Sequence, residues 1–163
     1  MNTSCLVRRR ALWHDGLTVR IRDFLLLVYD ALGPKLPEAL RDHHWRVRFG
    51  LLQVYFERPA VHYEVWVQRK AGRIELGLHF EGEQEENERW ASALGGRALE
   101  IQAQLGPRAE LEEWTSSWTR LHETLALSGD LTAELGEGIA ERLALYIEVL
   151  EPILQQERDA VAG

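Results

Sequence analysis

Residues 61–81 constrain the fold more than any other part of the chain, because apolar and polar residues alternate on both sides of a short interruption. A period of two is typical of half-buried β-strands, and residues 70–73 between the two runs predict a tight turn. A two-residue loop at 71–72 sets a register in which the apolar residues of both strands share one face. The expected pairs are Val67 with Leu76, Val65 with Leu78, and Tyr63 with Phe80.

The same register predicts a polar face on this hairpin, where directly opposite residues have Cβ atoms about 4.5–5.5 Å apart. It places His62 opposite Glu81 and Glu64 opposite His79. Two imidazoles and two carboxylates in one place suit zinc or another divalent metal ion. The alternative interpretation is a solvated sheet face on which each His/Glu pair contributes about 0.2–1 kcal/mol.

Trp66 and Gln68 extend the polar face, and the expected register places them opposite Gly77 and Glu75. A tryptophan on a polar sheet face either covers a glycine or marks a surface against which another molecule packs. Both interpretations stay open at this stage. The polar face is therefore the first candidate for an interaction surface as well as for a metal site.

Length and charge limit the function classes. The chain has 163 residues, the size of one ordinary domain, and no repeat or linker divides it. A formal net charge of −7 argues against a nucleic-acid partner, because phosphates require a basic surface. The single cysteine excludes an intrachain disulfide, and no apolar run reaches the length of a membrane span. We expect a cytoplasmic protein with one domain over residues 17–163, preceded by an arm over residues 1–16.

Three segments show the three- and four-residue spacing of amphipathic helices. The first covers residues 17–32. The second covers residues 83–105, where Gly95-Gly96 predicts either close packing against a neighbour or a local break. The third covers residues 131–154, and Pro152 is expected to limit or kink it.

The remaining regular segments favour strands. Residues 45–57 predict one strand, although the apolar positions change parity near Gly50, where a bulge is expected. Residues 110–114 and 118–127 predict two more strands, and a helix over 111–125 is the alternative. The element order is then α-β-β-β-α-β-β-α. It predicts a two-layer α+β domain in which a five-stranded, mainly antiparallel sheet carries the helices on one face.

Two further polar groups carry less information. His43 and His44 have the chemistry of metal ligands or acid–base catalysts, but a polar loop before a strand is the preferred interpretation. Residues 68–70, Gln-Arg-Lys, have the E/Q-x-K form of a restriction-nuclease core with Glu64 on the same face, yet they run into the hairpin turn. The chain lacks the signatures of α/β-hydrolases, P-loop proteins, zincin proteases and dinucleotide-binding folds.

Residues 72–106 combine a strand, a short acidic turn, an N-x-x-W helix start and a closing I-x-x-x-L-G run. This pattern resembles a bacterial domain family of unknown function that is often appended to predicted restriction-type nucleases. The resemblance extends over about residues 63–154 and implies an accessory role without catalytic residues. The chain departs from that family because it has a helical N-terminal third and no nuclease module. The positions that carry the pattern are Asn87, Trp90, Leu94, Ile101, Leu105 and Gly106.

The element order, size and negative charge are also similar to those of type III secretion chaperones. Those proteins are small, acidic and α+β, and they dimerise and hold extended segments of a partner. This second resemblance rests on no motif. It implies a protein that binds other proteins.

Together these observations predict a non-catalytic interaction or accessory domain that forms a homodimer, takes a protein partner and needs no cofactor or membrane. The expected interaction face consists of His62, Glu64, Trp66, Gln68 and His79. The alternative is a metal-dependent enzyme or nuclease-related protein. Its metal ligands would be His62, Glu64, His79 and Glu81.

Overall fold

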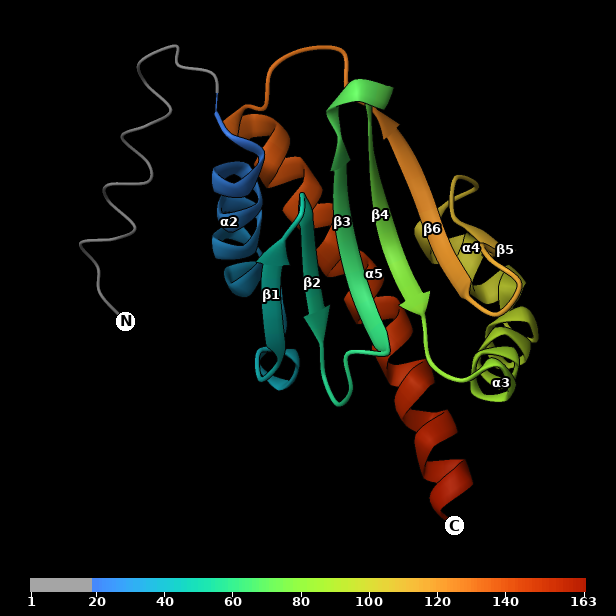
Figure 1. Cartoon of the computed structure of the whole chain (residues 1–163). Coiled ribbons are helices and arrows are strands. Elements are labelled where there is room, and N and C mark those ends of the chain that lie inside the picture. Colours follow the sequence, from blue (N-terminus) through green and yellow to red (C-terminus); the bar gives the residue numbers. More distant parts are fainter. Residues whose placement is uncertain (1–18) are drawn as a thin grey trace.

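The computed structural model describes residues 19–163 (Figure 1). The predicted arm over residues 1–16, with Arg8, Arg9 and Arg10, lies outside the described residues. The described helices are α2 (Ile21–Leu32), α3 (Gln84–Gly95), α4 (Ala98–Leu105) and α5 (Ala133–Ala162). The strands are β1 (His44–Arg48), β2 (Leu51–Tyr55), β3 (Val61–Gln68), β4 (Arg73–Phe80), β5 (Glu110–Glu113) and β6 (Thr119–Ala126). Short 3-10 turns occur at Gly33–Lys35, Glu38–Leu40 and Arg69–Ala71.

The strands form one open sheet with the order β1-β2-β3-β4-β6-β5, and each pair of neighbours is antiparallel. The predicted α+β class and antiparallel sheet are confirmed. The prediction of five strands is wrong, because residues 45–57 form a hairpin instead of one bulged strand. Phe49 (φ 52°) and Gly50 (φ 78°) adopt left-handed conformations that reverse the chain between β1 and β2. The change of parity near Gly50 was therefore the signal of a turn.

The register of the β3–β4 hairpin differs from the predicted one by two residues. A 3-10 turn at Arg69–Ala71 followed by Gly72 (φ 64°) makes the loop longer than the expected two residues. Val65 therefore pairs with Leu76, and His62 pairs with His79. A shift of two leaves every side chain on its predicted face, because the period of a strand is two.

The helices cover one face of the sheet. Figure 1 shows α5 passing behind the strands, and α2 packs along α5 beside β1 and β2. Tyr63 of β3 points toward this layer, because its hydroxyl donates a hydrogen bond to Glu151 of α5 at 2.9 Å. His62 and Glu64, on alternate positions of β3, therefore point to the opposite face. No described helix crosses that opposite face in Figure 1, and we name it the open face.

Two helical predictions need adjustment. The predicted helix over residues 83–105 is broken into α3 and α4 at Gly95-Gly96, which realises one of its two alternatives. Pro152 does not end α5, which continues to Ala162. Because Pro152 has no N–H, the carbonyl of Glu148 loses its helical hydrogen-bond donor. Both residues are exposed, so water can donate to that carbonyl instead. No described helix is long and apolar enough to cross a membrane.

Candidate metal centre

The centre of the open face is formed by two His-x-Glu sequences on neighbouring strands. His62 of β3 and His79 of β4 are direct cross-strand partners, and their rings stack with centroids 5.4 Å apart and planes 19° apart. Because the strands are antiparallel, Glu64 and Glu81 flank this pair from opposite ends. One ligand atom from each of the four residues lies within 4.8 Å of the other three. The predicted set of four is therefore brought together, although its predicted pairing is wrong.

These side chains are more buried than an open sheet face suggests. The exposed fraction is 1 % for His62, 2 % for His79 and 4 % for Glu64. Glu81 is half-buried and forms the solvent side of the group. Trp114 contributes to this burial, since its ring meets the ring of His79 edge-on with centroids 5.4 Å apart. The imidazoles therefore lie in a partly dry environment where ligand bonds to an ion face little competition from water.

Hydrogen bonds fix the orientation of His62. Its Nδ1 lies 2.7 Å from the carbonyl oxygen of Pro59, which can only accept, so Nδ1 carries the proton and donates. In the neutral ring Nε2 then carries the lone pair. It accepts a hydrogen bond from the amide nitrogen of Gln53 at 3.0 Å and lies 3.2 Å from a carboxylate oxygen of Glu64. A ring nitrogen that donates to a backbone carbonyl, which leaves the other nitrogen for the metal, is the usual arrangement of a metal-ligating histidine.

Glu64 is held in its ionised form. Burial acts to raise the pKa of this carboxyl, but the hydrogen bond that His62 donates when its ring is protonated, the nearby His79 and a 2.8 Å hydrogen bond from Gln53 together lower it below its ordinary value. Gln53 is itself oriented by Arg46, which donates to its carbonyl oxygen at 2.6 Å. The result is a charged, buried carboxylate beside Nε2 of His62, with the Gln53 amide in contact with both.

His79 has an unpartnered nitrogen. Its Nδ1 is buried without a hydrogen-bond partner and lies 3.4 Å from a carboxylate oxygen of Glu81. A buried polar atom left without a partner costs about 1–3 kcal/mol, and folded proteins contain few of them. This atom belongs to the same four-residue group. Eight buried side-chain atoms of the described residues lack a hydrogen-bond partner, and this is the one that belongs to the group.

An ion-pair network lies on the open face over β4, β6 and β5. Arg120 of β6 contacts Glu75 at 3.0 Å and Glu112, and its guanidinium lies 4.8 Å from the ring centre of Trp114. His122, two residues further along β6, has Nε2 2.8 Å from Glu112. Arg120 therefore offsets the negative charges of Glu75 and Glu112 beside the His/Glu group.

His122 makes the fold sensitive to mild acid. Burial and then the positive charge of Arg120 lower its pKa below the ordinary 6.5. The folded protein therefore binds fewer protons here than the unfolded chain, so this contribution to stability is complete above pH 6.5 and is lost as the pH falls below it. Urea unfolding from pH 7 to pH 5 should show a smaller loss of stability in His122→Gln than in the wild type. An unchanged pH dependence in that variant, or an equal change in the exposed-site control His44→Gln, would contradict this assignment.

Other predicted residues lie apart from the centre. His43 contacts the carbonyl of Leu40 at 3.1 Å, and His44 is exposed and stacks on Tyr55. Lys70 lies in the 3-10 turn beyond the end of β3, away from the mid-strand position that a nuclease core requires. No other group of three or more histidines, cysteines or acids with metal-binding spacing occurs in the part of the chain that the structure describes.

The predicted interaction residues share the open face as expected. Trp66 is half-buried and lies opposite Glu75, whereas Gly77 pairs with Glu64 and His122, so the predicted pairing of Trp66 with Gly77 is wrong. Gln68 lies opposite Arg73 and accepts a 3.0 Å hydrogen bond from its Nε. Sequence reasoning missed Gln53, Trp114 and Arg120. Gln53 could not be placed on this face while residues 45–57 were interpreted as one strand. Trp114 and Arg120 reach the site through pairing between distant strands, which no local sequence pattern predicts.

Comparisons with protein-family models, with curated proteins and with solved structures find no match to this chain. The two resemblances stated from the sequence therefore stay predictions.

Proposed function

We propose that the protein is a metal-binding domain that holds one divalent transition-metal ion, zinc by the chemistry of its donors, in the His/Glu group of the open face. The observation that carries this proposal is the convergence of two imidazoles and two carboxylates whose four ligand atoms lie within 4.8 Å of one another, with Nδ1 of His79 buried and without a hydrogen bond among them. An ion there would supply the partner that the nitrogen lacks.

The donor set favours zinc over magnesium or calcium. Two imidazole nitrogens and two carboxylate oxygens suit zinc and its neighbours, whereas magnesium and calcium prefer shells made of oxygen. His62 would bind through Nε2 and His79 through Nδ1. Glu64 is already ionised and buried beside them, and Glu81 closes the group from the solvent side. Four protein donors correspond to the closed, tetrahedral shell of a structural zinc site.

Such an ion would stabilise the sheet. It would join β3 to β4 at the His62–His79 pair and would offset the negative charges of Glu64 and Glu81, which otherwise face one another in a partly dry environment. Because the unfolded chain does not present these donors together, the free energy of binding adds to the free energy of folding. The proposal therefore assigns the ion a structural role, and assigns no catalytic residue.

Zinc should raise the midpoint of thermal unfolding of protein stripped with a chelator. At a free zinc concentration 100 times the dissociation constant, the expected stabilisation is about 2.7 kcal/mol. His79→Ala should remove this shift because it deletes one of four donors. His44→Ala is the matched control: it removes an exposed histidine from the same face and should keep the full shift. Absence of a shift with zinc, cobalt and manganese in the wild type, or an equal shift in His79→Ala, would contradict the proposal.

A further inference from the structure

The two edges of the open sheet are complementary in charge. Strand β1 ends the sheet on one side and β5 on the other, and neither has a second strand beside it in the described residues. On the open face β1 presents His44, Arg46 and Arg48, whereas β5 presents Glu110 and Glu112. Glu112 also pairs with Arg120, so Glu110 carries the charge of the β5 edge that has no ion-pair partner among the described residues. Each edge alone repels a copy of itself. The two unlike edges attract one another, since opposite charges across a strand pair are favourable.

The helix-side residues of the same edges are apolar and exposed. Trp45 of β1 is 42 % exposed even though its ring stacks on Tyr29 with centroids 4.0 Å apart. Val47 lies two residues further on the same side of β1. On β5, Leu111 is 36 % exposed. Each edge therefore combines charge on the open face with unburied apolar surface on the helix side.

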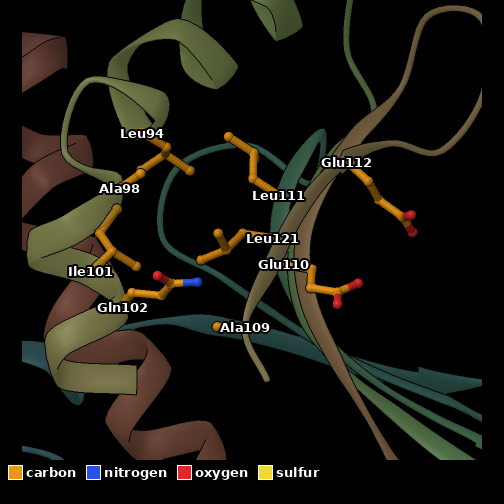
Figure 2. A pocket seen from close by; sticks show the side chains of 9 residues that line it. All are labelled: Leu94, Ala98, Ile101, Gln102, Ala109, Glu110, Leu111, Glu112 and Leu121. Carbon is orange, nitrogen blue, oxygen red and sulfur yellow. The ribbon is translucent and has the colours of Figure 1, made fainter. Parts of the chain in front are cut away.

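A cavity of about 330 Å³ lies under β5 on its helix side. Figure 2 shows Leu111 and Leu121 pointing into it toward Leu94 and Ile101 of α3 and α4, whereas the carboxylates of Glu110 and Glu112 point away from it. The cavity opens beside a strand edge that is free to pair. A free edge with an adjoining apolar pocket is the arrangement by which proteins bind an added strand: the edge supplies backbone hydrogen bonds and the pocket takes a side chain.

Strand direction allows a second copy to fit this edge. The six strands alternate in direction, so the first and last run oppositely. A copy displaced along the sheet brings its β1 antiparallel to β5 and keeps both open faces on the same side. The register that pairs Arg48 with Glu110 also pairs Arg46 with Glu112. It places Val47 opposite Leu111, at the mouth of the cavity.

We propose that the protein self-associates by adding β1 of one copy to β5 of the next, with Arg46 and Arg48 facing Glu112 and Glu110 and with Val47 and Trp45 covering the cavity beside Leu111. The contact is heterologous, so it leaves one free edge of each kind and lets further copies add. This inference is independent of the metal site. It also replaces the Trp66 face with the sheet edges as the contact between copies.

Exchange of charge between the edges tests the contact. Arg48 and Glu110 are exposed, and neither has an ion-pair partner among the described residues, so their substitution should leave the fold unchanged. Sedimentation velocity of the wild type at increasing concentration should show species larger than the monomer. Arg48→Glu alone and Glu110→Lys alone should each shift the population to monomer. The double variant, which restores opposite charges, should regain association, and added salt should weaken it.

Three outcomes would overturn the proposal. One is a wild type that stays monomeric at every attainable concentration. Another is association that persists in both single variants, which would assign the contact to a different surface. The third is a double variant that stays monomeric although circular dichroism shows it folded. A synthetic peptide with the sequence of residues 43–49 provides an independent readout, since the proposal predicts that it binds the Arg48→Glu variant, whose β5 edge is intact, and not Glu110→Lys.

Discussion

Arg142→Leu is expected to lower the free energy of unfolding by about 3–5 kcal/mol, the usual cost of removing one partner from a buried ion pair. Glu123 lies on β6 facing the helices and is buried, with its carboxylate paired to Arg142 of α5. Its other neighbour is Arg108, whose Nε lies 3.3 Å away but whose side chain is mostly exposed. Without Arg142 the carboxylate would keep only that weaker partner, and the carbonyl of Leu105 would lose a donor.

Equilibrium urea unfolding measures this effect. The matched control is the double variant Arg142→Leu/Glu123→Leu, which removes both charges and should recover most of the lost stability, because no unpaired charge stays buried. A single variant within about 1 kcal/mol of the wild type would show that Arg108 alone compensates Glu123. A double variant no more stable than the single one would show that packing, and not charge, dominates at this position.

Gly77→Ala is expected to prevent stable folding. A Cβ at position 77 would lie 2.3 Å from the carbonyl oxygen of Leu121 and 2.6 Å from the Cα of His122. Both are backbone atoms of β6, so no side-chain rotation can relieve the overlap. Strands β4 and β6 would have to separate in the middle of the sheet. The expected cost exceeds about 4 kcal/mol, a large part of the stability of an ordinary domain.

Gly138→Ala is the matched control for this substitution. Gly138 lies within α5, and a Cβ there would meet nothing within 4 Å. Alanine in a helix interior is favoured over glycine by about 1 kcal/mol, so this variant should be slightly more stable than the wild type. Soluble expression and thermal unfolding of the two variants give the comparison. A Gly77→Ala protein that unfolds near the wild-type temperature would contradict the close approach of β4 and β6.

The sequence predicts the sheet face on which each residue of β3 and β4 lies better than it predicts the cross-strand partner of that residue. Alternation along β3 and β4 places His62, Glu64 and His79 on one face, and this holds for any register that differs by two residues. The partner of each residue depends on the loop, and the 3-10 turn at Arg69–Ala71 follows no strong local signal. The four candidate ligands therefore lie together even though the predicted register is wrong. The predicted pairing of Trp66 with Gly77 is wrong.

Other errors came from local signals that have two physical meanings. A change of parity within a β-rich segment indicates either a bulge or a turn, and at Phe49-Gly50 the turn is formed. A proline within a helical pattern need not end the helix where solvent can donate a hydrogen bond to the carbonyl four residues earlier. Pro152 lies on the exposed side of α5, where this condition is met. Gln53 of β2 and Arg46 of β1 support His62. The interpretation of residues 45–57 as a single strand could not predict this arrangement.

The most direct test of the central claim is titration of metal-free protein with Co²⁺, followed by visible absorption. The account predicts the intense bands of a tetrahedral site, saturating at one ion per chain and disappearing when zinc displaces cobalt. His62→Ala and His79→Ala should each abolish these bands, whereas His44→Ala should retain them. A wild-type spectrum that shows only the weak absorption of hydrated cobalt, or tetrahedral bands that persist in His62→Ala, would contradict a metal site on this face of the sheet.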